Sequence, residues 1–371
     1  MKYPSAKKVG GMRGHWKWLS AIVLIGLAAT FLVHAFQARI ATAILAHMVE
    51  ARIGHDSTAA LPDGLHVALC GTGSPLPDPT RAGPCSVVIA GKHMFVVDIG
   101  EGGARKIMAM GLPIGRVEGL LLTHFHSDHV DGIGPLMLQR WIGRAATAPL
   151  PVHGPPGVEA VVAGFDAAYA TDAGYRTAHH GVRIAPPGGA GGVAMPFALP
   201  QPNAPVVVLA RDGVRIIAFR VDHGPVRPAV GYRFDYKGRS VVFSGDTKPS
   251  ASLAAAAKGA DLLVHEALQP RLVGLLTTTL DRHGQPNTAQ ITRDILNYHS
   301  TPEQAADMAK AAGVKQLLLN HIVPPIPLRF AYPAFLGDAA QHFAGPIIVG
   351  EDGMLFSLPA GATTIMQSRL Q

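Results

Sequence analysis

The run Thr123-His124-Phe125-His126-Ser127-Asp128-His129 is the most informative stretch of this chain. It follows an apolar segment, and residues 120–123 predict a β-strand. Residues at positions i and i+2 of an extended segment share a face, so His124 and His126 can reach one metal ion. Asp128 and His129 follow at once and can reach a second ion from the adjacent turn. Imidazole and carboxylate groups suit Zn²⁺ and similar metals, so the run predicts a metal site at the end of a strand.

Four ligands cannot complete two metal sites, and three further candidates each follow a predicted strand. His223 follows residues 214–221, Asp246 follows residues 240–244, and His321 follows residues 316–320. We expect one ion to be held by His124, His126 and His223, a second by Asp128, His129 and His321, and both to be bridged by Asp246. Two metals about 4 Å apart would hold a hydroxide at neutral pH and clamp an ester oxyanion. The sequence therefore predicts a hydrolase with two Zn²⁺ ions, with Mn²⁺ or Fe²⁺ as alternatives.

The rest of the chain has an α/β pattern, in which short β-branched runs alternate with Ala-rich helical stretches. Further strands are predicted at residues 66–70, 86–90, 93–98, 229–236, 261–265 and 347–349. Helices are predicted at residues 101–110, 134–144, 250–258 and 302–312, and the last begins after an N-cap, Thr301, with Gln304 completing a capping box. Residues 186–205 are rich in Gly and Pro and predict a surface loop. Residues 272–300 have few periodic apolar positions and predict a mobile loop or lid near the site.

The order of these motifs resembles the metallo-β-lactamase superfamily, and within it the branch of ribonuclease Z-like and arylsulfatase-like enzymes. Besides the histidine-rich run, the landmarks are Gly71 to Pro75, Asp98 to Glu101, Gly231 to Arg233, Ser244 to Thr247, His265 to Ala267, His299 to Thr301, and His321. The resemblance implies a four-layer αββα sandwich, with the metals at one edge of two sheets. It also implies the same ligand assignment.

The resemblance further implies roles for residues around the metals. Asp128 would accept a proton as well as bind metal, Asp98 would hold a ligand imidazole, and His265 would be a further supporting residue around the metals. His299 matches the family's catalytic histidine, which protonates or stabilises the leaving oxygen, and Glu266 would orient it. The alternative for His299 is a residue at the start of a helix, beside the cap Thr301, and we favour the catalytic role.

The amino terminus predicts a membrane anchor. Residues 19–36 are almost entirely apolar and would span roughly 27 Å as a helix. Five basic residues and no acidic ones precede them, which would keep residues 1–18 in the cytoplasm and place the rest in the periplasm or outside the membrane. A signal cleaved near Ala41 to Ala43, giving a secreted protein, and a buried core helix are the alternatives. We expect a stalk at residues 37–60, a hydrolase domain at 61–360 and a tail at 361–371.

Amino-acid composition indicates a folded protein and gives only weak evidence about nucleic-acid binding. Hydrophobic residues make up 48% of the 371 residues and charged residues 15%, which favours a large core over disorder. The net charge is +7, but the five amino-terminal positives supply most of it, so charge alone is weak evidence for nucleic-acid binding. Cys70 and Cys85 lack the spacing of a metal site, and the sequence leaves open two buried thiols or a disulfide, which export would favour.

Our prediction of the substrate depends on two features that are typical of tRNA-processing members of this family, a Lys/Arg-rich arm and a Phe-Ser-x-Arg-Tyr run. The segment between His153 and His223 has no Lys/Arg-rich arm, and residues 322–327 do not contain the Phe-Ser-x-Arg-Tyr run. Together with the anchor, this leads us to expect an exported hydrolase of small phosphodiester or aryl sulfate esters. The alternatives are a ribonuclease Z, which cleaves precursor tRNA at its 3′ side, and a non-catalytic metal-binding protein. A homodimer is left open.

Overall fold

The computed structural model describes Tyr3 and residues 12–370, which fall into two compact units divided between His55 and Asp56. The first unit consists of helix α1 (Met12–Arg52). Its length and composition are sufficient to cross a membrane, a test that a signal sequence also passes. Residues 1–2 and 4–11 of the predicted basic segment lie outside the described residues. Insertion of α1 into a membrane stays a prediction, as do the location of the chain and the expected domain limits.

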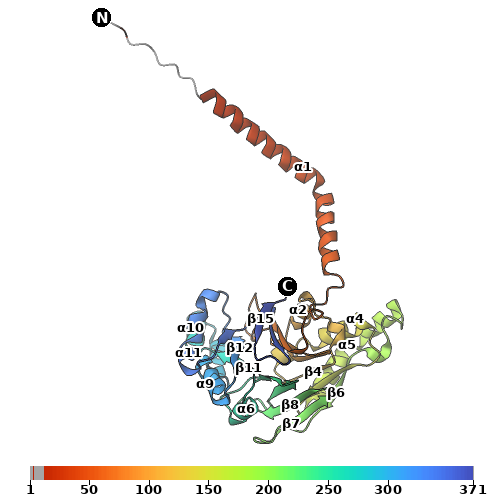
Figure 1. The fold of residues 1–371 in the computed structure, drawn as a ribbon, viewed down its shortest axis with the longest axis vertical. Helices are drawn as coiled ribbons and strands as arrows, with labels where there is room; N and C mark the ends of the chain where they lie inside the picture. The colour runs from red at the N-terminus through yellow and green to blue at the C-terminus, as the bar shows by residue number, and fades with distance from the viewer. Residues whose placement is uncertain (1–2, 4–11, 371) are drawn as a thin grey trace. The chain divides into compact units, whose positions relative to one another are not determined.

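The second unit contains two β-sheets (Figure 1). The first has eight strands in the order β15-β14-β1-β2-β3-β4-β5-β6. Their bounds are β1 (Gly64–Gly71), β2 (Cys85–Ala90), β3 (His93–Ile99), β4 (Gly119–Leu121), β5 (Leu150–Gly154), β6 (Gly192–Pro196), β14 (Met354–Pro359) and β15 (Met366–Arg369). Strands β1 and β2 pair antiparallel, whereas β3, β4 and β5 pair in parallel. The parallel part therefore directs the carboxyl ends of β3 and β4 to the same edge.

The second sheet has seven strands in the order β13-β12-β11-β10-β9-β8-β7. Their bounds are β7 (Val206–Arg211), β8 (Val214–Arg220), β9 (Val230–Tyr236), β10 (Arg239–Phe243), β11 (Leu262–Leu268), β12 (Gln316–Val323) and β13 (Ile347–Val349). Strands β10, β11, β12 and β13 pair in parallel. Loops that follow β10, β11 and β12 consequently gather at one edge of this sheet.

Helices cover the outer face of each sheet (Figure 1). The first sheet carries α2 (Gly103–Ala109), α3 (Ser127–Val130), α4 (Ile133–Arg144) and α5 (Val158–His180). The second carries α6 (Ala251–Ala256), α9 (Pro302–Ala312), α10 (Tyr332–Leu336) and α11 (Ala339–His342). One apolar core lies between the sheets and one beneath each helical layer. The αββα sandwich expected from the sequence is confirmed, and α9 begins with the predicted Thr301–Gln304 capping box.

The predicted loop or lid at residues 272–300 is wrong. This segment forms α7 (Pro270–Arg282), α8 (Pro286–Asp294) and a 3₁₀ turn at Ile295–Asn297. The two helices contact each other through the hydroxyls of Thr277 and Thr292, which lie 2.8 Å apart, and Val273 is buried. Leu272, Leu276 and Leu280 recur every four residues, which is a helical period, so the loop prediction overlooked an amphipathic pattern in α7. Helix α8 is short and mostly polar, and its sequence carries little such pattern.

Two other predicted irregular segments contain strands. Residues 186–205 include β6, which pairs in parallel with β5, so this segment is only partly a surface loop. Residues 361–371, expected as a tail, include β15, which pairs with β14. Both strands are short and lie at the ends of the first sheet, where one neighbour supplies the backbone hydrogen bonds that propensity alone does not reveal.

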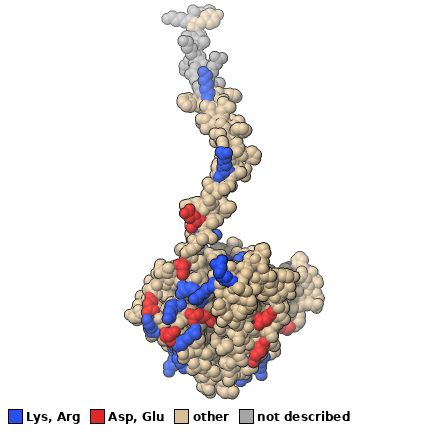
Figure 2. Space-filling view, turned by 90° about the vertical axis from the view of Figure 1, so that its right-hand side faces the viewer, with Lys and Arg blue, Asp and Glu red and all other residues tan. Residues whose placement is uncertain are grey.

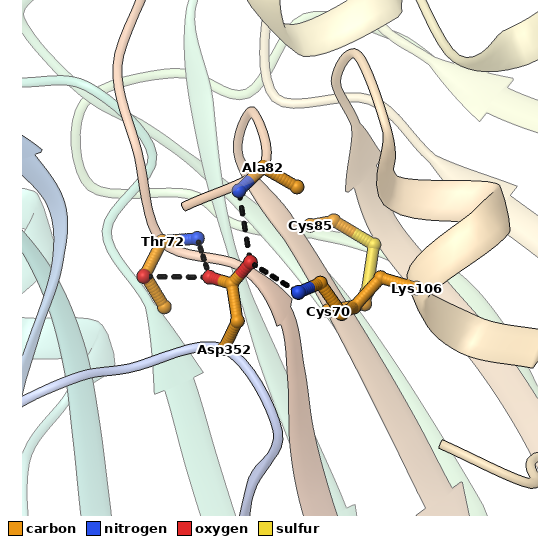
Figure 3. Close-up of a disulfide and its surroundings, with 6 residues drawn as sticks. All are labelled: Cys70, Thr72, Ala82, Cys85, Lys106 and Asp352. Carbon is orange, nitrogen blue, oxygen red and sulfur yellow. Dashed lines mark hydrogen bonds and ion pairs between the residues drawn. A yellow bond between two sulfur atoms is a disulfide. The ribbon is translucent and has the colours of Figure 1, made fainter. Parts of the chain in front are cut away.

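Cys70 and Cys85 form a disulfide that joins β1 to β2 (Figure 3). The bond closes the loop from Gly71 to Pro84. Asp352 fixes the same loop, because its carboxylate accepts hydrogen bonds from the backbone and hydroxyl of Thr72, at 3.0 and 2.8 Å, and from the Ala82 backbone at 2.8 Å. Of the two arrangements that the sequence left open, the structure contains the disulfide.

Candidate metal centre

The histidine-rich run is held in place by Asp98, the residue near the end of β3. Its carboxylate accepts hydrogen bonds from the Thr123 backbone and hydroxyl, both at 2.8 Å, and lies 2.9 Å from Nδ1 of His129. Asp98 has a left-handed backbone with φ of 52°, a conformation that costs free energy for a residue with a side chain. The contact with His129 Nδ1 leaves Nε2 of the same ring facing the interior of the site.

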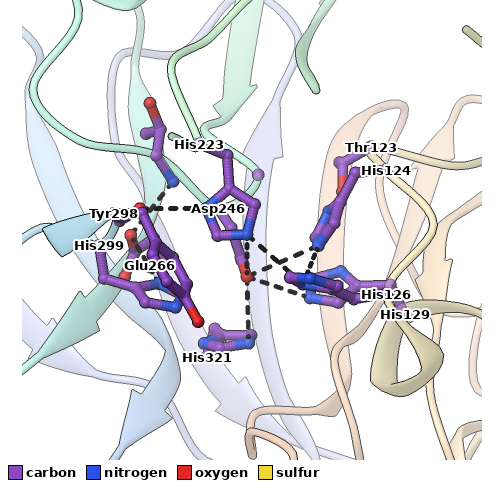
Figure 4. Close-up of polar contacts among 12 residues, drawn as sticks. Thr123, His124, His126, His129, His223, Asp246, Glu266, Tyr298, His299 and His321 are labelled. Atoms are coloured by element: carbon purple, nitrogen blue, oxygen red, sulfur yellow. Dashed lines mark hydrogen bonds and ion pairs between the residues drawn. The ribbon is translucent and has the colours of Figure 1, made fainter. Parts of the chain in front are cut away.

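Three predicted ligands converge from two sheets (Figure 4). His124 and His126 follow β4, and His223 follows β8. Nδ1 of His126 lies 3.0 Å from Nε2 of His124 and 3.4 Å from Nε2 of His223. A tetrahedral ion with nitrogen ligands at about 2.05 Å keeps neighbouring ligand atoms about 3.3 Å apart, so this spacing fits a shared cation.

The other predicted ligands form an adjacent group. Asp128 Oδ2 lies 3.2 Å from Nε2 of His321 and 3.5 Å from Nε2 of His129. His321 lies on β12 with φ of 47°, a second left-handed backbone in the site. Nε2 of His129 is buried and has no hydrogen-bond partner among residues 12–370. An orphaned ring nitrogen beside a carboxylate is what a metal ligand looks like when the ion is removed.

Asp246 lies between the two groups. Its Oδ2 atom is 3.7 and 3.8 Å from Nε2 of His223 and His124, and 3.4 Å from Nε2 of both His129 and His321. Gly245 must remain glycine to place it, because φ there is 60° and a Cβ would lie 2.7 Å from the Val230 carbonyl oxygen. The structure thus brings all seven predicted ligands together, and their role as ligands remains a proposal.

The electrostatics of the cluster also suit cations. Burial lowers the pKa of His124 well below its ordinary value and lowers that of His223, so both rings present neutral lone pairs at pH 7. Burial also opposes protonation of His321, but the carboxylates of Asp246 and Asp128 outweigh it and raise its pKa to about 9. Burial disfavours the charged form of Asp246, yet the His321 and His129 side chains hold its pKa well below the ordinary range. A buried carboxylate that stays ionised needs positive charge beside it.

His299 and Glu266 form a pair at the margin of the cluster. Nδ1 of His299 lies 3.2 Å from Glu266 Oε1. That oxygen also accepts hydrogen bonds from the backbones of Ser300 at 2.9 Å and Thr247 at 3.2 Å. The His299 ring stacks on His321 with centroids 5.6 Å apart, so its other nitrogen is available on the side of the cluster (Figure 4). The predicted acid and its orienting carboxylate are therefore adjacent.

His265 was expected to support the centre but makes no contact with the candidate ligands, and Tyr298, which packs against two histidines of the site, was not predicted. His265 is buried on β11, with Nδ1 2.7 Å from the carbonyl oxygen of Glu266, and we find no contact between its side chain and the candidate ligands. Tyr298 was not predicted, although its ring lies 5.0 Å from His223 and 4.9 Å from His299. The sequence signal for Tyr298 was only its place directly before His299.

Residues 103–322 match a family model described as the beta-lactamase superfamily domain. This chain belongs to that superfamily. Ribonuclease Z of Mycobacterium avium (strain 104) is 40% identical over 290 residues, which cover 78% of this chain and 96% of the relative. Ribonuclease Z of Mycolicibacterium gilvum (strain PYR-GCK) is 40% identical over 294 residues. The fold is also that of human tRNase Z, short form, with a TM-score of 0.55 at 22% identity, covering 79% of this chain and 99% of that one.

These relatives overturn the main functional expectation. An exported hydrolase of small aryl sulfate or phosphodiester substrates was predicted, because this chain lacks a basic arm and a Phe-Ser-x-Arg-Tyr run and begins with a predicted membrane anchor. Relatives that are 40% identical over 78% of this chain carry the name ribonuclease Z, although this chain lacks both features. Absence of the arm therefore does not separate this chain from them. The alternative expectation agrees better with the relatives.

Proposed function

We propose that this chain is a metal-dependent endoribonuclease of the ribonuclease Z type, which hydrolyses a phosphodiester bond on the 3′ side of precursor tRNA. One observation carries the proposal: four candidate ligand imidazoles lie 3.4 to 3.8 Å from a single oxygen of Asp246, in a chain 40% identical to ribonucleases Z. The adjacent His299–Glu266 pair supports catalysis over a metal-storing or scaffold role, because such a role needs no proton donor.

The two groups of side chains would hold two divalent cations. His124, His126 and His223 would bind one, and Asp128, His129 and His321 the other, with Asp246 in contact with both. We propose Zn²⁺ because imidazole dominates the ligand set, with Mn²⁺ or Fe²⁺ as alternatives. Bound there, the cations would acidify water and stabilise negative charge on the scissile phosphate.

The chain's own residues move the protons. The Asp128 carboxylate accepts the proton of the attacking water at the oxygen that does not face His321. His299, held at Nδ1 by Glu266, donates a proton from Nε2 to the oxygen that leaves phosphorus. Glu266 itself is fixed by the backbone amides of Ser300 and Thr247, so the imidazole keeps one orientation.

The test is cleavage of a precursor tRNA transcript by the zinc-loaded full chain. We expect a shortened tRNA and a released 3′ trailer. Asp246→Asn should lower the rate at least about 10³-fold, since it removes the contact common to both groups. Asp235→Asn is the matched control, because Asp235 lies on β9 and pairs with Arg233 at 2.9 Å, away from the candidate ligands. Metal-loaded protein that leaves the transcript intact would overturn the proposal.

A further inference from the structure

A cavity of about 420 Å³ lies beside the candidate metal centre. His223, a candidate ligand, forms part of its wall, so cavity and centre share a side chain. Pro156, Leu199 and Pro228 supply apolar surface. The volume lies within the range of pockets that hold small organic ligands. Position and size together make the cavity suited to the part of a substrate that flanks the reacting group.

Two arginines give this cavity its charge. Arg220 is the last residue of β8 and shares a strand face with Ile216 and Ala218, which lie in the core between the sheets. Its half-buried side chain lines the cavity and has no ion-pair partner among the described residues. Arg227 donates from Nε to the Gly224 carbonyl oxygen at 3.2 Å, which leaves the terminal nitrogens of its guanidinium free of protein partners among residues 12–370.

The lining holds one acidic residue against these two arginines. Asp222 pairs with Lys248 at 3.1 Å and accepts a hydrogen bond from the Gly224 backbone at 3.1 Å. Asp222 also interacts electrostatically with Arg227. Two guanidiniums against one carboxylate leave the lining with a net positive charge, and Lys248 shares that carboxylate. Elsewhere, basic and acidic side chains are interspersed on the face seen in Figure 2, and on such a surface RNA contacts depend on local groups.

We propose that this cavity is a nucleotide subsite, in which Arg220 and Arg227 bind the phosphate next to the cleaved bond. Guanidinium groups suit this role because their parallel N–H groups match two phosphate oxygens. Pro156, Leu199 and Pro228 pack against the ribose or base of the same nucleotide. The assignment to RNA rests on the proposed function, whereas the affinity for a phosphorylated nucleoside rests on the cavity.

The test measures binding of adenosine 3′,5′-bisphosphate to the zinc-loaded full chain by calorimetry. Arg220→Gln and Arg227→Gln should each weaken binding about tenfold or more, the effect of one charge-assisted hydrogen bond. Arg215→Gln is the matched control, because Arg215 lies on the same strand but on its opposite face, 4.0 Å from Asp235. With a short single-stranded RNA, each lost phosphate contact should reduce the salt dependence of log K by about 0.7.

The outcomes separate this inference from the proposed function. If the bisphosphate binds in a way that depends on both arginines but the transcript is not cleaved, the subsite proposal stands and the proposed ribonuclease activity is rejected. Cleavage of the transcript with an unchanged KM and unchanged bisphosphate affinity in both arginine variants would reject the subsite and keep the ribonuclease. Arg227 is exposed, so its variant remains informative if loss of the half-buried Arg220 disturbs folding.

Discussion

The backbone carbonyl oxygen of Tyr298 lies 3.0 Å from Nδ1 of His223. A neutral imidazole that donates its Nδ1 proton to this carbonyl keeps Nε2 free as a lone pair, which is the form a metal requires. The residue that orients a candidate ligand is therefore the one that precedes the candidate acid, His299. Residues 298–299 therefore hold both a candidate metal ligand, through the Tyr298 carbonyl, and the candidate acid, His299. We expect a displacement of this segment to affect both metal binding and protonation of the leaving oxygen.

Gly224→Ala tests the link. Gly224 has φ of 58°, and a Cβ there would lie 2.9 Å from Cβ of Tyr298, so the substitution displaces the segment from His223. We expect zinc affinity to fall about 10- to 100-fold, the usual effect of losing an outer partner of a ligand. Competition with a chelator measures it. Gly164→Ala, in the exposed part of α5 with no atom within 4 Å of the new Cβ, is the control and should leave affinity unchanged.

His299→Ala should lower kcat about 10²- to 10⁴-fold on RNA while bound zinc is retained, because a proton donor is lost and the candidate ligands remain. Glu266→Gln should have a smaller effect of the same kind. The decisive measurement compares RNA with an aryl phosphodiester whose leaving group needs no proton. The aryl substrate should lose far less rate than RNA, and equal losses on both substrates would exclude His299 as the acid.

Replacing Cys70 and Cys85 by Ala should lower the free energy of unfolding by about 2–4 kcal/mol, since the bond closes a loop of some 15 residues. Urea denaturation with and without dithiothreitol measures the change. The reductant should destabilise the wild-type chain and leave the double variant as it was. If the urea midpoint of the wild-type chain is the same with and without dithiothreitol, the disulfide contributes little to stability.

Glu351 predicts a dependence of stability on pH. Burial disfavours its charge, but hydrogen bonds from Arg329, Tyr332 and Arg369 outweigh burial and lower its pKa from 4.5 to about 2. The native state therefore binds the proton less tightly than the unfolded chain, so the stabilisation is complete above pH 4.5 and is lost as pH falls toward 2. Both arginines are largely exposed, so we expect only about 1–2 kcal/mol.

Comparing the free energies of unfolding of Glu351→Gln and wild type measures the contribution of the Glu351 carboxylate. The variant should be less stable at pH 7, and the difference should shrink between pH 4.5 and pH 2. Asp172→Asn is the control, because Asp172 and Arg176 form a partly exposed pair on α5, one helical turn apart, that should contribute only tenths of a kcal/mol. A difference that stays constant down to pH 2 would rule out the Glu351 carboxylate as the titrating group.

Helix α1 predicts association of the full chain with lipid vesicles. Its apolar side chains are exposed along the described part of the helix, and residues 56–371 form a compact unit with their own cores. The full chain should float with vesicles in a density gradient, and a chain beginning at Asp56 should not, with its thermal midpoint within about 3 °C of the full chain. A full chain that stays at the bottom of the gradient would reject the anchor.

The sequence by itself determined the α/β class and the residues of the candidate centre. The His124 to His129 run, His223 and Asp246 just after strands, and His321 near the end of β12 were readable because alternation and strand ends are local properties. Helices α7 and α8 were mistaken for a loop, although the apolar residues of α7 recur at a helical period. The functional prediction also gave too much weight to the missing basic arm, because motifs within one sequence do not show how much such an absence matters for function.

Only the tertiary structure decided which atoms meet. Asp246 Oδ2 faces both histidine groups because two sheets bring their strand ends to one edge, an arrangement of long-range pairing that no local pattern encodes. Long-range folding also places the Tyr298 carbonyl on His223, 75 residues away in the chain, and brings Pro156 and Leu199 to the cavity beside Arg220. Cys70 and Cys85 are 15 residues apart and meet because β1 pairs with β2, a register that the sequence alone did not reveal.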